Sequence, residues 1–154
     1  MSVQRSGTAV GAMFSLVLAM PALSAELNPA ALVYQLPDQI KWNAPSAAGS
    51  QNAILVGDPS KGGLYLVRNK WLKGNHFSRP HFHPNDRFIT VLGGTWWMGS
   101  GTNFDPDNSV PLPAGTFVTH FGKQVHWDGA KDEEAWLIIV GEGPGTLTFV
   151  DAAN

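Results

Sequence analysis

The sequence predicts an all-β domain of the jelly-roll type, a barrel or sandwich of short antiparallel strands. From Ala53 onward, short apolar runs recur between turn-forming residues. No segment repeats its apolar residues with the 3.6-residue period of a helix over three turns. The chain holds 17 Gly and 11 Pro, which suit tight turns, and 6 Trp and 8 Phe, which can fill an interior. We therefore expect about eight to eleven strands in one domain of ~130 residues.

The first 25 residues differ from the rest. They contain one basic residue, Arg5, then an apolar stretch over 9–20, then Pro21 and small residues. This pattern is typical of a secretory signal peptide, and the apolar run is short for a membrane span. An uncleaved N-terminal anchor is the alternative. Cleavage after Ser24 or Ala25 would leave 26–154 as a single periplasmic or secreted domain with no membrane partner.

The first part of the predicted domain is weakly patterned. In 26–53, short apolar pieces are broken by Pro37 and Pro45, and we expect one or two strands there that wrap onto the main body. Clearer strands follow at 53–58 and 63–71, and in the second of these Tyr65 and Val67 face away from Leu64 and Leu66.

The remaining strands are separated by turn signals. Residues 87–99 read as two strands around the Gly93-Gly94 turn, and 103–115 as a turn-rich connection. Further strands are expected at 116–121, 126–130, 133–143 and 145–151.

Composition bears on the possible partners and metal ligands of the chain. The formal charge of -2 gives no electrostatic reason to expect a nucleic-acid partner. The chain has no cysteine, so a transition-metal site would have to use His, Asp or Glu.

One candidate site is the pair His81 and His83. Residues two apart in a strand project to the same face, so two imidazoles there could share a metal ion at about 2.0–2.1 Å. A third ligand would come from another strand, from His120 or His126. His76 lies in a turn-like stretch and is expected at the surface. The alternative is that the pair is an ordinary surface feature of a strand.

The spacing around these histidines resembles the two motifs of the cupin superfamily. The first is commonly written G(X)5HXH(X)3-4E(X)6G. His81 and His83 fit it, Gly94 fits the closing glycine, and Arg87 stands where the family has glutamate. Gly74 lies one place too early for the leading glycine.

The second motif is commonly written G(X)5PXG(X)2H(X)3N. Gly115 and His126 fit it, whereas Phe121, Lys123 and Ala130 replace its Pro, Gly and Asn. The likeness covers about residues 60–145 and is to small, single-domain bacterial cupins.

The resemblance implies a double-stranded β-helix, the RmlC-like jelly-roll barrel. It also implies that His81, His83 and His126 bind one divalent transition metal, whether Fe, Zn, Ni, Cu or Mn. A small-molecule ligand or substrate and a homodimer are further implications.

Arg87 leaves three readings open. In the first, it binds an anionic group of a substrate beside a three-histidine site, because arginine cannot ligate a metal. In the second, it turns outward and pairs with Asp86 or Asp128. In the third, its presence marks the loss of the metal. Asp128 and Glu142 could act as general bases only if they face the cavity.

Two functions follow from these readings. The first is an exported metal-dependent enzyme, dioxygenase-like or an isomerase or lyase, that acts on a small organic molecule. The second is a non-catalytic module that binds a metal or a small anion.

Overall fold

The computed structural model describes residues 25–151, and its contacts divide the chain into 1–34 and 35–154. In the first unit, the described residues form a turn in which Ala30 N donates to Asn28 Oδ1 at 2.9 Å. The predicted signal peptide lies outside the described residues, apart from Ala25. No helix within the described part of the chain has the length and hydropathy to cross a membrane.

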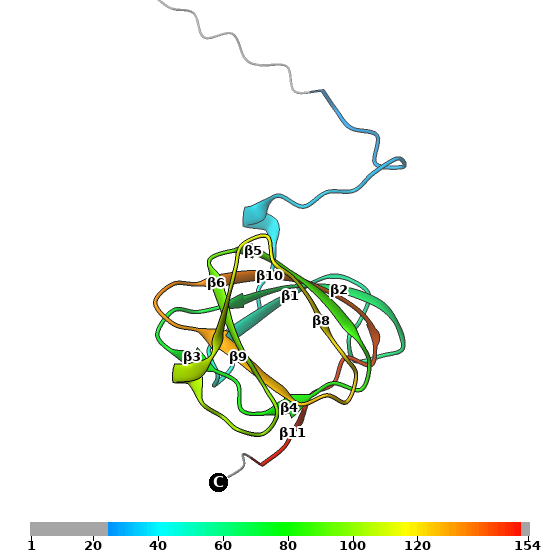
Figure 1. The fold of residues 1–154 in the computed structure, drawn as a ribbon. Helices are drawn as coiled ribbons and strands as arrows, with labels where there is room; N and C mark the ends of the chain where they lie inside the picture. The colour runs from blue at the N-terminus through cyan, green and yellow to red at the C-terminus, as the bar shows by residue number, and fades with distance from the viewer. Residues whose placement is uncertain (1–24, 152–154) are drawn as a thin grey trace, which may run out of the picture. The chain divides into compact units, whose positions relative to one another are not determined.

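The second unit is built from two antiparallel sheets (Figure 1). The strands of the first sheet are, in spatial order, β1 (Ser50–Val56), β2 (Gly63–Trp71), β10 (Ala135–Gly143), β5 (Arg87–Gly93) and β8 (Phe117–His120). The strands of the second are β11 (Thr148–Phe149), β4 (His81–Phe82), β9 (His126–Ala130), β6 (Thr95–Ser100) and β7 (Val110–Pro113), with β3 (His76–Phe77) beside β9. The all-β jelly-roll prediction is confirmed.

The core lies between the sheets and follows the expected alternation. In β2, every second residue from Tyr65 to Trp71 is buried, while the residues between them are more exposed. The main cluster of buried hydrophobic side chains comprises Tyr65, Val67, Trp71, Ile89, Val91, Trp96, Ala130, Ala135, Leu137 and Ile139. These residues come from both sheets, so the same packing that stabilises the barrel also fixes its inner wall.

Three sequence predictions need correction. Only β1, which begins at Ser50, forms in 26–53; before it, the described residues contain just the short 3-10 helix η1 (Pro37–Gln39). The predicted connection over 103–115 contains a second 3-10 helix, η2 (Pro106–Asn108), and the strand β7, which pairs with β6. β7 is an edge strand of its sheet, and proline, which has no N–H to donate, is tolerated in an edge strand. His76, expected in a turn, belongs to β3 and is half-buried.

Candidate metal centre

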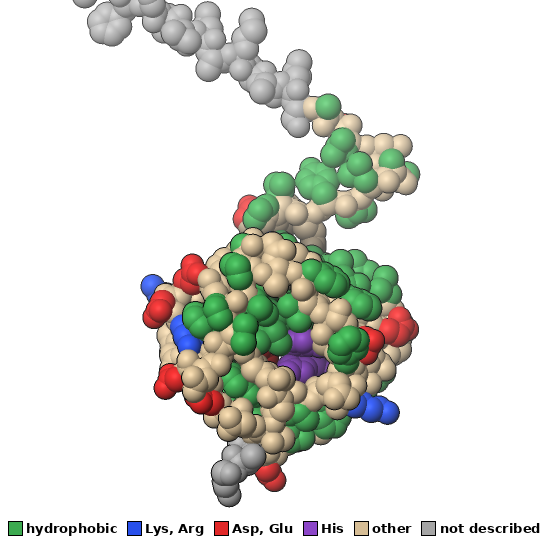
Figure 2. Space-filling model, viewed as in Figure 1, with side chains coloured by type: hydrophobic (Ala, Val, Ile, Leu, Met, Phe, Trp, Pro, Cys, Tyr) green, Lys and Arg blue, Asp and Glu red, His purple; other side chains and the backbone are tan. Residues whose placement is uncertain are grey.

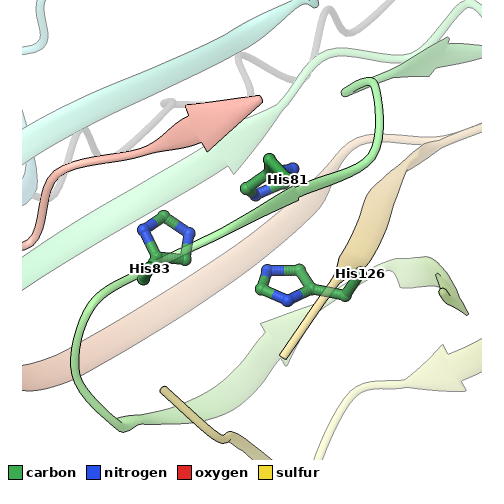
Figure 3. Close-up of side chains that lie close together, drawn as sticks. All are labelled: His81, His83 and His126. Atoms are coloured by element: carbon green, nitrogen blue, oxygen red, sulfur yellow. The ribbon is translucent and has the colours of Figure 1, made fainter. Parts of the chain in front are cut away.

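Three histidines from two neighbouring strands meet inside the barrel (Figure 3). His81 in β4 pairs directly with His126 in β9, and His83 comes immediately after β4, two residues after His81. All three residues are buried: His81 is 3% exposed, His83 4% and His126 6%. The pairing places side chains that are 45 residues apart in sequence next to one another, as the resemblance predicted.

Each of these histidines is oriented by a hydrogen bond to a backbone carbonyl. His81 Nδ1 lies 2.8 Å from Arg79 O, His83 Nδ1 2.9 Å from Thr146 O, and His126 Nδ1 3.1 Å from Gln124 O. A carbonyl oxygen can only accept, so each neutral ring carries its proton on Nδ1. Each Nε2 therefore keeps its lone pair, which is the arrangement found in metal-ligating histidines.

The Nε2 atoms have the placement of ligands. Those of His83 and His126 are buried and have no hydrogen-bond partner among the described residues. One potential ligand atom from each of the three side chains lies within 4.8 Å of the others. Nitrogens that share one ion at about 2.0–2.1 Å lie within about 4.2 Å of one another, a separation close to this one. The group could hold a metal ion.

Burial favours the neutral form of His83 and His126. It lowers the pKa of His126 to about 4, with nearby Asp128 opposing the shift. It also lowers the pKa of His83 to about 2, and the positive charge of Arg87 adds to that shift. Neutral imidazole is the form that binds a metal.

Arg87 points inward. It begins β5 and pairs across the sheet with His120 in β8 and Gly141 in β10. Its Nε is fully buried without a partner among the described residues, although the residue as a whole is only half-buried. Burial lowers the pKa of the Arg87 guanidinium, and the neighbouring Asp128 and Tyr65 oppose this. The outward reading of Arg87 is therefore wrong.

Asp128 is the buried carboxylate of the site. It lies on the same face of β9 as His126, and its Oδ1 is 3.9 Å from His81 Nε2. It accepts hydrogen bonds from Ser78 Oγ and Trp96 Nε1, both at 3.0 Å. Glu142 is exposed, so of the two candidate bases only Asp128 faces the interior.

Asp86 does not reach the histidines. It is exposed, and its Oδ1 accepts a hydrogen bond from the backbone N–H of Gly122 at 2.7 Å. Asp86 therefore does not replace the glutamate of the first motif as a ligand.

A cavity of about 690 Å³ adjoins the centre. Its wall includes His81, His83, Arg87 and Asp128, together with apolar side chains such as Trp96 and Leu137. Figure 2 shows histidine surfaces within a hollow rimmed by apolar side chains. A second cavity of about 590 Å³ has Tyr65 and Trp42 in its wall and also reaches Arg87.

Sequence reasoning missed Tyr65 as part of the site. Gly141 in β10 pairs with Tyr65 on one side and Arg87 on the other, and it has no side chain to separate them. A Cβ on Gly141 would crowd the Tyr65 hydroxyl. Alternation along 63–71 placed Tyr65 on the face opposite Leu64 and Leu66, but only the strand order brings it to Arg87.

Comparison with known proteins identifies the fold. No model of a protein family matches the chain, and no curated protein matches it. The similar solved structures include the polyketide cyclase RemF from Streptomyces resistomycificus, with TM-score 0.60 and 16% identity over 80% of this chain and 88% of that one. An RmlC-like cupin from Shewanella frigidimarina gives a TM-score of 0.55 and 16% identity over 71% of this chain and 88% of that one. A protein with a double-stranded β-helix domain from Klebsiella pneumoniae gives a TM-score of 0.54 and 17% identity over 75% of this chain and 94% of that one.

Structures of DMSP lyases and of an oxalate oxidase are also similar to this chain. At such low identities these likenesses show the fold. The domain is a double-stranded β-helix of the cupin type.

Proposed function

We propose that this chain binds one divalent transition metal through His81, His83 and His126 and acts on a small anionic organic molecule. The observation that carries the proposal is the set of three Nδ1–H···O=C hydrogen bonds. Together they direct three imidazoles toward one buried point, a costly arrangement for polar atoms that have no partner.

The donor set indicates the class of metal. Neutral imidazole nitrogens suit Fe, Zn, Ni, Cu or Mn better than Mg or Ca, which prefer oxygen. When bound, such an ion supplies a Lewis acid that can polarise an oxygen of the ligand.

Charge at the centre supports an anionic ligand. Among the described residues nearest the histidines, Arg87 and Asp128 carry opposite charges, so a divalent ion would leave a net charge of about +2. A glutamate at the position of Arg87, as in the family motif, would reduce that charge. Here a carboxylate or enolate of the substrate would provide the compensation, and Arg87 is placed to bind it by charge-assisted hydrogen bonds.

The cavity supports a small organic substrate. Its volume of about 690 Å³ lies within the usual range for ligand pockets, and its wall combines apolar side chains with a few polar groups. Several structures of similar fold are named as enzymes: a cyclase, lyases and an oxidase. Oxygen insertion, isomerisation and elimination are all compatible with this site, because the fold does not choose among them.

A non-catalytic binding module is the second candidate, and the state of Asp128 favours it. This is the one carboxylate in the described wall of the larger cavity, and it already accepts two hydrogen bonds from side chains. A base that is engaged in this way is poorly placed to accept a substrate proton. Export and homodimer formation stay predictions from the sequence.

Elemental analysis of the mature domain, purified without an affinity tag, tests metal binding. We expect close to one equivalent of metal in the parent and its loss in His81→Ala and His126→Ala. His76→Ala is the matched control, because it removes a half-buried histidine outside the cluster. Absence of metal in the parent after reconstitution with Fe, Zn, Ni, Cu and Mn, each in turn, would disprove the proposal. If metal binds but turnover is not found among small carboxylates under oxygen, the binding module is favoured.

A further inference from the structure

His120 belongs to the same buried centre but is held in the opposite way from the other three histidines. Its Nδ1 lies 3.0 Å from the Arg87 guanidinium nitrogen Nη2. Arginine has only donors, so His120 Nδ1 must accept. A neutral His120 therefore carries its proton on Nε2, whereas His81, His83 and His126 carry theirs on Nδ1.

The Nε2–H of His120 is a donor without an acceptor. The atom is fully buried, and no hydrogen-bond partner for it exists among the described residues. The ring lies against the centre: its centroid is 3.8 Å from that of His126 and 5.4 Å from that of Trp96. A buried, unpaired N–H beside a ligand site is unfavourable unless a ligand completes it.

We infer that His120 donates its Nε2–H to an anionic oxygen of the ligand in this centre, and that Arg87 is the positioning residue that fixes the tautomer. The inference rests on the proposed function and narrows its substrate class to molecules that present a carboxylate or enolate oxygen beside the three-histidine group. Arg87 would thus affect the ligand in two ways: its positive charge attracts the anion, and its hydrogen bond fixes the tautomer of His120.

A role for His120 as a fourth metal ligand conflicts with this geometry. To ligate through Nε2, a neutral ring would carry its proton on Nδ1, where it would face the N–H groups of Arg87. The ligand atoms that lie within 4.8 Å of one another also come from the other three histidines and not from His120.

Nitrogen-15 NMR of histidine-labelled protein tests the tautomers directly. In the metal-free parent at neutral pH, we expect His120 as the Nε2–H form and His81, His83 and His126 as the Nδ1–H form. Arg87→Met removes the donor and should release His120 from the single Nε2–H form while leaving the other three unchanged. An Nδ1–H signal for His120 in the parent would overturn the inference.

Anion binding tests the donor role, with Co²⁺ as the metal probe and acetate as the anion. We expect His120→Phe to bind Co²⁺ within about threefold of the parent, and to bind acetate about tenfold more weakly, as judged by the Co²⁺ absorption spectrum. The control ligand is acetamide, which is neutral. Its affinity should differ little between the parent and His120→Phe. His120→Gln, which offers an amide N–H, should restore part of the acetate affinity.

The outcomes separate the two proposals. If His120→Phe loses Co²⁺ as completely as His126→Ala does, His120 is a metal ligand and the inference fails. Unchanged acetate affinity in a variant that is folded by circular dichroism would also overturn it. If the parent takes up neither Co²⁺ nor any of Fe, Zn, Ni, Cu and Mn, the proposed function fails. Acetate titration of the metal-free protein, followed through the His120 nitrogen signals, then still decides the donor role: no shift on adding acetate rejects it.

Discussion

At the scale of single residues, Asp128 shows how the centre depends on complete hydrogen bonding. Its carboxylate is buried and accepts hydrogen bonds from Ser78, which follows β3, and from Trp96 in β6. It is also the negative charge that opposes the buried guanidinium of Arg87. Removing it would leave two buried donors and one buried cation without their partner.

We predict that Asp128→Ala lowers the free energy of unfolding by about 2–5 kcal/mol, since each unsatisfied buried donor costs about 1–3 kcal/mol. Asp128→Asn should cost less, because its amide oxygen can still accept one of the two hydrogen bonds. Urea denaturation of the metal-free proteins measures both. The control is Glu142→Ala at an exposed position, with an expected change within about 0.5 kcal/mol. Equal stability of Asp128→Ala and Glu142→Ala would contradict the structural role.

At the scale of elements, two adjacent glycines at the β5–β6 turn differ in what the backbone requires of them. Gly94 has φ +67°, in the left-handed region, and a Cβ there would overlap the backbone carbonyl of Glu134. Gly93 is not among the residues with positive φ, and a Cβ on it would meet the Trp136 side chain at an ordinary 3.7 Å. Only the second glycine is required by the backbone, and it is the one that fits the first motif.

Gly94→Ala should therefore lower the free energy of unfolding by about 2 kcal/mol or more, through left-handed strain and the clash with Glu134. Gly93→Ala, the matched control one residue earlier, should change it by less than about 1 kcal/mol. Thermal unfolding of the two variants under identical conditions makes the comparison. Equal losses would show that the turn tolerates rearrangement.

At the scale of the whole molecule, the buried histidines link stability to pH. Folding places His83 and His126 where burial lowers their pKa values, to about 2 and about 4. In the unfolded chain each protonates near pH 6.5. Below about pH 6.5 the unfolded state therefore binds more protons, so stability falls as pH falls toward 4 for His126 and toward 2 for His83.

For the metal-free protein, we expect the free energy of unfolding to decrease steeply from pH 6.5 to pH 5. Each such histidine contributes a slope that approaches about 1.4 kcal/mol per pH unit. Urea denaturation at several pH values measures this slope. His83→Phe should flatten it by one such contribution, whereas above about pH 7.5 the slopes of parent and variant should coincide. A variant slope identical to that of the parent at pH 5–6.5 would contradict the role of burial.

The sequence by itself determined the all-β class, most strand positions and the three histidines. Alternation with period two and the motif spacing are local features, and they survive in the folded chain because one face of each strand must be buried. The same reasoning failed at β7, where the edge position makes prolines tolerable, and this position is a property of the sheet rather than of the segment.

Only the tertiary structure decided how Arg87, His120 and Tyr65 meet. Their contacts depend on the order β2-β10-β5-β8 and on its register, which sets Arg87 opposite His120 and leaves Gly141 between Arg87 and Tyr65. The tautomers of His83 and His120 follow from hydrogen-bond partners that are distant in sequence, Thr146 and Arg87, whereas the partners of His81 and His126 are backbone carbonyls two residues away. Residue type and spacing specify which side chains share a face, whereas strand order and register decide which partners those side chains find.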